Sequence, residues 1–356
     1  MSKIDKLFRV LLDRGASDLH LLQGQPPKLR LHGHLVAMEG APPLTESALL
    51  QLLEEICPPT TWSAYQATGD ADFAYAMGEE ARFRANYYKG VTGIGAVFRI
   101  IPVKILTLDM LKAPEIFKEF VSYKMGLVLV TGPTGSGKST TLAAILDHLN
   151  TNLSRRVLTI EDPVEFVHKD KQSTFIQREV GSDTISFSSA LRAAGREDCD
   201  VILVGEMRDL ETISLAISAA ETGALVFGTL HTNSAAKTID RIVNVFPADQ
   251  QRSVRNLLAG SLKAIISQQL LRTADGQGRV AVHEILLQNA AAGAAIREGH
   301  IAKLNQVIQS GRKMGMQSMD DALLRLVKDG VVEAEAAYMK ANDKKMFKHL
   351  LKDKAG

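Results

Sequence analysis

Apolar residues in the first hundred positions follow helical spacing first and strand spacing afterwards. Helical spacing is shown by four apolar residues separated by charged ones, Ile4, Leu7, Phe8 and Leu11. Strands are predicted where apolar and polar residues alternate or turn residues interrupt apolar runs, at 19–36, 70–77, 81–88 and 93–101. The segment 45–56 has helical periodicity again. Residues 1–101 are therefore predicted to form a small α+β domain, followed by a linker at 102–114 that begins with Pro102.

The pattern changes in the second part of the chain, where short apolar runs alternate with helical stretches. The runs that we interpret as strands are 126–132, 155–162, 200–206 and 224–232. Apolar strands separated by helices are typical of a parallel sheet that is covered on both faces. We therefore predict an α/β core over 115–289 and, because the chain then becomes rich in Ala, Lys and Met with helical periodicity, a helical subdomain over 290–356.

Composition and charge narrow the class of protein. The chain has 356 residues, of which 46% are hydrophobic and 23% charged, with a net charge of +2. This balance gives no general reason to expect a nucleic-acid binder. Cys57 and Cys199 form no CxxC pair, so we interpret them as free thiols. Because no apolar run approaches the roughly 18 residues of a membrane span, we expect a cytoplasmic protein.

The segment Gly132–Ser139 fits the phosphate-loop pattern GxxxxGK[ST], with a strand-like LVLV before it and a helical stretch after it. Glycines let successive backbone N–H groups point at phosphates, and the start of the helix adds its positive end. Lys138 is expected to reach the β- and γ-phosphates of ATP, and the Ser139 hydroxyl to bind Mg²⁺. The alternative is a glycine-rich structural turn. The candidates for nucleotide binding are Gly132, Pro133, Thr134, Gly135, Ser136, Gly137, Lys138, Ser139 and Thr140.

Acidic residues follow two other predicted strands. The apolar run 201–204 is followed by Glu206, which would lie beside Mg²⁺ and the γ-phosphate and polarise the attacking water. A surface carboxylate is the alternative. Glu161, Asp162 and Glu165 surround a proline after another strand, and such clustered carboxylates need a cation or an arginine nearby. An acidic structural turn competes with that interpretation. Glu161 and Glu206 join Ser139 as candidate metal ligands.

His231 follows the predicted strand in 224–232. At the carboxyl end of a strand in an open α/β sheet it would face the ligand crevice, where it could hydrogen-bond the γ-phosphate. A lone histidine is more often structural, so both interpretations stay open at this point.

Over nearly its full length, the chain resembles the twitching-motility ATPases, which retract type IV pili and belong to the bacterial secretion ATPase superfamily. The resemblance rests on ordered strings, namely GASDLHL (15–21), ARFRAN (81–86), GLVLVTGPTGSGKSTTLAAILD (126–147), TIEDPVEFVH (159–168), QREVG (177–181), ALRAAGREDCDVILVGEMRDLETI (190–213), AETGALVFGTLHTNSAAKTIDRIVNVFP (220–247) and GRKMGMQSMDDALLRL (311–326). It implies an N-terminal PAS-like domain, a RecA-like P-loop NTPase domain, and a homohexameric ring with nucleotide at the subunit interfaces. It also implies a partner, an inner-membrane pilus platform protein that would hold the ring at the membrane.

The resemblance further assigns residues. The four sequence boxes of the family fall on 132–139, on the acidic cluster at Glu161, on Glu206 and on His231. Arginines of the N-terminal domain approach the nucleotide in such rings, and the matching candidates are Arg82, Arg84 and Arg99. Each of them could equally be an arginine on the surface of a strand. The absence of a CxxC metal insert favours the retraction branch over the assembly branch.

The sequence departs from the family pattern at a few positions. Thr92 replaces an arginine, Ala224 replaces a histidine, and the residues 291–295 (AAGAA) replace an AIRNL segment; Gly195 and Cys199 stand where Leu and Pro are usual. Three functions are therefore weighed: a pilus-retraction motor, an accessory retraction paralogue with weak ATP turnover, and a hexameric nucleic-acid translocase. The balanced charge and an aromatic content of 5% argue against the translocase.

Overall fold

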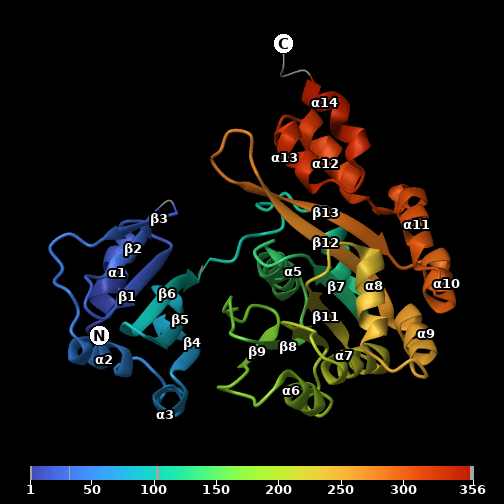
Figure 1. Cartoon of the computed structure of the whole chain (residues 1–356). Helices are drawn as coiled ribbons and strands as arrows, with labels where there is room; N and C mark the ends of the chain where they lie inside the picture. Colours follow the sequence, from blue (N-terminus) through green and yellow to red (C-terminus); the bar gives the residue numbers. More distant parts are fainter. Residues whose placement is uncertain (1, 32, 102–103, 353–356) are drawn as a thin grey trace. The chain divides into compact units, whose positions relative to one another are not determined.

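The computed structural model describes residues 2–31, 33–101 and 104–352. They divide into two compact units (Figure 1). The first unit comprises Met1–Lys104 with Pro163–Val167, and the second comprises Ile105–Asp162 and His168–Gly356. Pro102, predicted to begin the linker, lies outside the described residues.

The first unit is built on a six-stranded antiparallel sheet in the order β3-β2-β1-β6-β5-β4. Its strands are β1 (Asp18–Leu22), β2 (Lys28–Leu31), β3 (His34–Ala37), β4 (Asp70–Met77), β5 (Ala81–Gly90) and β6 (Gly93–Ile101). Its helices are α1 (Asp5–Asp13), α2 (Glu46–Glu54) and α3 (Pro59–Thr68). The strands predicted from alternation are all present.

One face of this sheet carries the core of the first unit. Along β5, buried Ala81, Phe83 and Ala85 alternate with more exposed residues, as expected for a strand with one face in a core. Phe8 of α1 stacks on Phe83 with ring centroids 4.0 Å apart. The apolar positions that predicted the first helix therefore pack on the sheet.

Helix α3 was missed by the sequence analysis because PTTWSAYQAT lacks a clear apolar stripe. Its boundaries are nevertheless marked by local chemistry. Pro59 occupies the first turn, where a missing N–H costs nothing, and Gly69 ends the helix with a left-handed φ of 89°.

The second unit is built on a seven-stranded sheet in the order β13-β12-β7-β11-β10-β8-β9. Its strands are β7 (Gly126–Thr131), β8 (Arg156–Glu161), β9 (Thr174–Glu179), β10 (Val201–Val204), β11 (Leu225–Leu230), β12 (Leu262–Arg272) and β13 (Arg279–Leu287). Every neighbouring pair is parallel except β12 and β13. The expected parallel sheet is therefore a mixed one with an antiparallel edge, and β9, β12 and β13 had not been predicted.

Helices flank this sheet on both sides. In Figure 1, α5 (Lys138–Asn152) lies on one side of β7, and α7 (Leu210–Thr222) and α8 (Ala235–Asn244) lie on the other. The starts of α7 and α8 are fixed by N-caps, since Asp209 accepts from Thr212 N and Ser234 accepts from Lys237 N. The remaining helices of the core are α4 (Ile116–Glu119), α6 (Phe187–Ala194) and α9 (Gln251–Ser261), with the 3₁₀ turn η1 (Phe120–Ser122).

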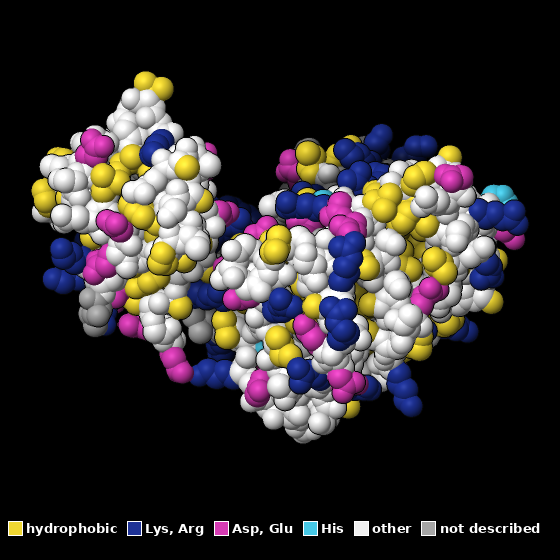
Figure 2. Space-filling model, turned by 90° about the horizontal axis from the view of Figure 1, so that it is seen from below, with side chains coloured by type: hydrophobic (Ala, Val, Ile, Leu, Met, Phe, Trp, Pro, Cys, Tyr) yellow, Lys and Arg dark blue, Asp and Glu magenta, His cyan; other side chains and the backbone are white. Residues whose placement is uncertain are grey.

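The segment after β13 is helical, as the composition indicated. It contains α10 (Ala290–Glu298), η2 (Ile301–Lys303), α11 (Leu304–Ser310), η3 (Arg312–Met314), α12 (Met319–Lys328), α13 (Ala334–Lys340), η4 (Lys344–Phe347) and α14 (Lys348–Lys352). Within the described part of the chain, no helix is both long enough and apolar enough to span a lipid bilayer. On the face shown in Figure 2, basic and acidic side chains are interspersed.

Candidate functional site

Four neighbouring parallel strands of the second unit end at one edge of the sheet. Leu230, at the end of β11, is paired with Thr131, at the end of β7. On the other side of β11, Val204 of β10 is paired with Gly228, and it is also paired with Ile160 of β8. The segments that follow these strands are therefore brought together, and they carry the predicted phosphate loop, His231, Glu206 and Glu161.

The phosphate loop joins β7 to α5 and needs glycine at specific positions. Gly132, Gly135 and Gly137 have φ angles of 149°, 76° and 86°, which residues with a side chain rarely adopt. A Cβ atom at position 132 would lie 2.3 Å from the backbone oxygen of Gln268. The loop therefore runs tightly along β12 and delivers the chain into the N-terminus of α5.

The side chains of the loop are arranged as a phosphate site requires. Lys138 Nζ donates to the carbonyl oxygens of Gly132 and Pro133 at 2.9 and 3.2 Å, which holds the ammonium over the loop. The Ser136 hydroxyl is buried and has no hydrogen-bond partner among the described residues. Ser139 and Thr140 are partly accessible at the start of α5. These donors fit a phosphate group and one hard cation bound through a hydroxyl.

Glu206 lies beyond the end of β10, where two cationic or polar groups contact it. Its Oε1 atom lies 3.0 Å from His231 Nε2 and 2.5 Å from Arg208 Nε. Burial alone raises the pKa of the carboxyl, but the hydrogen bond from Arg208 and the electrostatic effects of His231, Arg208 and Lys138 outweigh it. The pKa of Glu206 is therefore lowered, and the side chain is an ionised carboxylate at neutral pH.

The acidic cluster after β8 is split by the fold. Glu161 ends β8 and its Oε1 accepts from Thr159 Oγ1 at 2.7 Å, at the same sheet edge as Glu206. Asp162 is exposed, and its charge raises the pKa of Arg208, although the hydrogen bond to Glu206 contributes more. Glu165 falls in Pro163–Val167, which groups with the other unit. The roles predicted for these acids stay predictions.

The three candidate arginines lie in the first unit, on the sheet face opposite its core. Arg84 forms a bidentate pair with Asp72, at 2.6 and 3.1 Å. Arg99 donates to Asp18 at 2.8 Å. Arg82 and Arg84 alternate with buried residues of β5, and Arg84 is paired with Arg99 across to β6. Their approach to a nucleotide stays a prediction.

Two residues near the site were missed by the sequence analysis. Arg208 lies in the segment EMRD (206–209) but was assigned no role, because the sequence around a single arginine in a loop does not reveal its partner. Gln268 is 1% exposed on β12, and its side chain donates to the phosphate loop at Ser136 O. The sequence feature that could have indicated Gln268 is the polar pair Gln268–Gln269 inside the largely apolar run 264–271.

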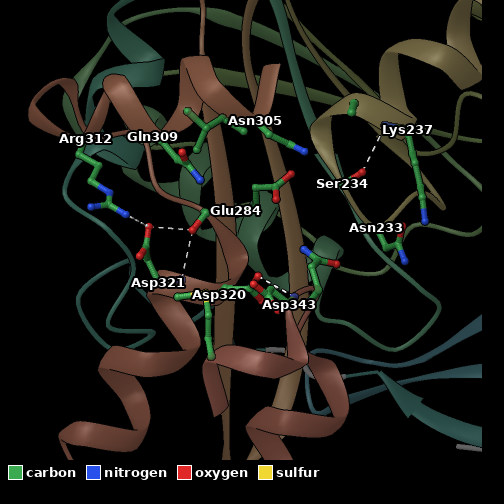
Figure 3. Close-up of a pocket in the computed structure, with 15 residues that line it drawn as sticks. Asn233, Ser234, Lys237, Glu284, Asn305, Gln309, Arg312, Asp320, Asp321 and Asp343 are labelled. Carbon is green, nitrogen blue, oxygen red and sulfur yellow. Dashed lines mark hydrogen bonds and ion pairs between the residues drawn. The ribbon is translucent and has the colours of Figure 1, made fainter. Parts of the chain in front are cut away.

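A separate cavity of about 430 Å³ lies between α8, β13, α11 and α12 (Figure 3). Its lining is mostly polar and includes no residue of the phosphate loop. Glu284 lies in its wall and accepts from Ala235 N at 2.8 Å, so it caps α8 a few residues after His231. Asp321 pairs with Arg312 at 2.6 Å. These acids are satisfied within the protein and hold helices in place.

Comparisons with known proteins show the family of the chain. The family model described as Type II/IV secretion system protein matches residues 2–354. The chain is 50% identical over 338 residues to the type IV pilus retraction ATPase PilT of Pseudomonas aeruginosa, which covers 95% of this chain and 98% of that protein. It is 36% identical over 353 residues to the type IV pilus ATPase PilU of the same organism, covering 98% and 91%.

A solved structure extends the comparison to the fold. The crystal structure of the pilus retraction motor PilT with bound ADP superposes with a TM-score of 0.90 at 42% identity, covering 97% of this chain and 98% of that one. The α/β fold class and the resemblance to the retraction ATPases are confirmed. The chain belongs to the type II/IV secretion system protein family.

Proposed function

We propose that this chain is a Mg²⁺-dependent ATPase that works as one subunit of a hexameric ring and powers the retraction of type IV pili. One observation carries the proposal: an ionised Glu206, hydrogen-bonded to His231, stands at the sheet edge that holds a phosphate loop. The identity to PilT extends over 95% of the chain and supports the same function.

The residues of the site suggest how ATP would be hydrolysed. Backbone N–H groups of 132–139 and the Lys138 ammonium would bind the β- and γ-phosphates. The Glu206 carboxylate would orient a water molecule in line with the γ-phosphorus and accept its proton. Bound Mg²⁺ would neutralise charge on the phosphate oxygens, with Ser139 as a ligand and Glu161 and Glu206 nearby.

His231 and Arg208 would control the orientation of the Glu206 carboxylate. Both contact the same oxygen, Oε1, so the other oxygen is left to face the water. A histidine that contacts both the carboxylate and the γ-phosphate would report whether ATP or ADP is bound. Turnover at one site could in this way alter the packing of neighbouring subunits.

The proposed assembly is the one that the resemblance to the retraction ATPases implies. Nucleotide would lie between subunits of a homohexamer, where Arg82, Arg84 and Arg99 of a neighbouring copy would stabilise the developing charge. The ring would work in the cytoplasm on an inner-membrane pilus platform protein, and a paralogous retraction ATPase is a further candidate partner. Repeated closure of the subunits would perform mechanical work on that platform.

An accessory paralogue with weak turnover is the second candidate, favoured by the departures from the family pattern. At one of these departures, residues 291–295, the structure weakens the argument for an accessory paralogue. The residues 291–295 still form α10, which begins at a cap where Asn289 accepts from Ala292 N. The identity is also higher to PilT, at 50%, than to PilU, at 36%. Both observations favour the motor over the accessory subunit.

We expect the purified chain to form a ring and to hydrolyse ATP only with Mg²⁺, at a rate that DNA and RNA do not change. The net charge of +2 gives no general reason to expect a nucleic-acid binder, and basic and acidic side chains are mixed on the face in Figure 2. Phosphate release and particle size are the measurements. A many-fold stimulation by nucleic acid would favour the translocase instead, whereas normal twitching after gene deletion would favour the accessory subunit.

A further inference from the structure

A buried glutamine on β12 contacts the phosphate loop from the neighbouring strand. Gln268 Nε2 donates to the carbonyl oxygen of Ser136 at 2.6 Å, although the two residues are 132 positions apart. We infer that Gln268 is a positioning residue for nucleotide binding, because it fixes the orientation of the Ser136–Gly137 peptide in the phosphate loop. This inference deepens the proposed ATPase function and rests on it.

Because the peptide bond is planar, the contact between Gln268 and the Ser136 carbonyl also fixes the direction of the Gly137 N–H. In a trans peptide the C=O and the following N–H point in opposite directions. Since the carbonyl of Ser136 points at Gln268, the N–H of Gly137 points away from β12. In a phosphate loop, successive backbone N–H groups point at the anion, so the N–H of Gly137 would have to keep this orientation to be one of them. A rotation of this one peptide would present a carbonyl oxygen to an anion.

The amide of Gln268 is itself held in one orientation. Its Oε1 accepts from Thr141 Oγ1 at 2.8 Å and lies 3.2 Å from His283 Nε2. Because this oxygen can only accept, His283 must donate from Nε2. Burial lowers the pKa of His283 to about 4, so the ring is neutral at physiological pH, and the hydrogen bond to Gln268 places its one proton on Nε2. The carbonyl oxygen of Ser136 can only accept, so a flipped amide would place two acceptor oxygens against each other.

The surroundings leave little room for an alternative arrangement. Gln268, Thr141, Ser136 and His283 are all at most 5% exposed. The ring of His283 is packed edge-to-face on Phe117, with centroids 5.0 Å apart. A Cβ atom at Gly137 would lie 2.9 Å from Gln268 Nε2. The absence of a side chain at Gly137 is therefore what allows the amide of Gln268 to reach the loop.

Replacing Gln268 with methionine tests the inference in the full-length chain. Methionine has a similar length and fits a core, but it cannot donate to Ser136. The loop binds the phosphates of ATP in the ground state and the transition state alike, so losing its orientation raises KM without lowering kcat. We expect KM for ATP and Kd for ADP to rise about tenfold, as for a lost hydrogen bond to a buried acceptor, with kcat within about twofold.

Gln269→Met is the matched control, because Gln269 is the neighbouring glutamine on the opposite, half-buried side of β12. It should change neither constant. A folded Gln268→Met protein with unchanged KM and Kd would overturn the inference, as would a loss confined to kcat. If Gln268→Met does not fold, Thr141→Val removes one support of the amide and should raise Kd for ADP by about threefold; an unchanged Kd overturns the inference.

The experiments can contradict the proposed function without contradicting the role of Gln268. A wild-type chain without ATP turnover would contradict the ATPase proposal, while the affinities for ADP of the variants would still test the role of Gln268.

Discussion

Replacing Glu206 with glutamine is expected to abolish ATP turnover while leaving nucleotide binding intact. Glutamine keeps the shape of the side chain and an oxygen that can accept from His231, which lies 3.0 Å from Glu206 in the wild type. It lacks the negative charge and the basicity needed to orient and deprotonate water. Loss of a general base lowers kcat by roughly 10²- to 10⁴-fold. Phosphate release gives kcat, and calorimetry with ATP gives the affinity.

Glu211→Gln provides the matched control for that experiment. Glu211 is also a carboxylate paired with an arginine, Arg192 of α6, but it is exposed in the first turn of α7 and has no role in the proposed site. Its replacement should leave kcat unchanged. Turnover that survives in the Glu206 variant would refute the role of that residue as the base, and a parallel loss of ATP binding would indicate a structural role instead.

Replacing Lys138 with alanine is expected to remove nucleotide binding. The ammonium now donates to two carbonyl oxygens of the loop, and in the complex it would bind two phosphates of ATP. Hydrogen bonds between charged groups are the strong ones, so losing two of them should weaken ATP binding by roughly 100-fold or more. Kd for ATP is measured by calorimetry, with the thermal midpoint of the free protein as a check on folding.

Lys237→Ala is the control for the lysine experiment, since Lys237 lies in the first turn of α8 as Lys138 lies in the first turn of α5. The control should bind ATP as the wild type does. If the Lys138 variant bound ATP with wild-type affinity, the loop would not be the phosphate site.

The sequence was informative where function depends on residues close together in the chain. The phosphate loop, Glu206 and His231 each follow an apolar run, and parallel strands bring their carboxyl ends to one edge whatever the order of the strands. The need for glycine in the loop was also predicted from the motif, and Gly137 has the left-handed φ that this prediction requires. These parts of the candidate site needed no knowledge of tertiary contacts.

The remaining features depend on contacts between distant segments. Gln268 lies in a run that could be strand or buried helix, and nothing in the sequence indicates that its amide reaches Ser136. Strand β13 is antiparallel to β12, to which a short turn joins it, and neither strand was predicted from the sequence. The pairing of Arg208 with Glu206 is likewise a property of the folded chain.

Position 224, where the family pattern is expected to have a histidine, carries a buried alanine in this chain. Ala224 is 8% exposed and lies directly before β11, where its N–H donates to Ala219 O. An alanine fits this buried place well, so the fold tolerates the change.

The most direct test of the ATPase account is a crystal structure of this chain with Mg²⁺ and a non-hydrolysable ATP analogue. The account predicts that the phosphates lie against the N–H groups of 132–139, with the Ser139 hydroxyl on the metal and the Glu206 carboxylate facing the water beside the γ-phosphorus. A loop without nucleotide at saturating concentrations, or a Glu206 side chain turned away from that water, would contradict it.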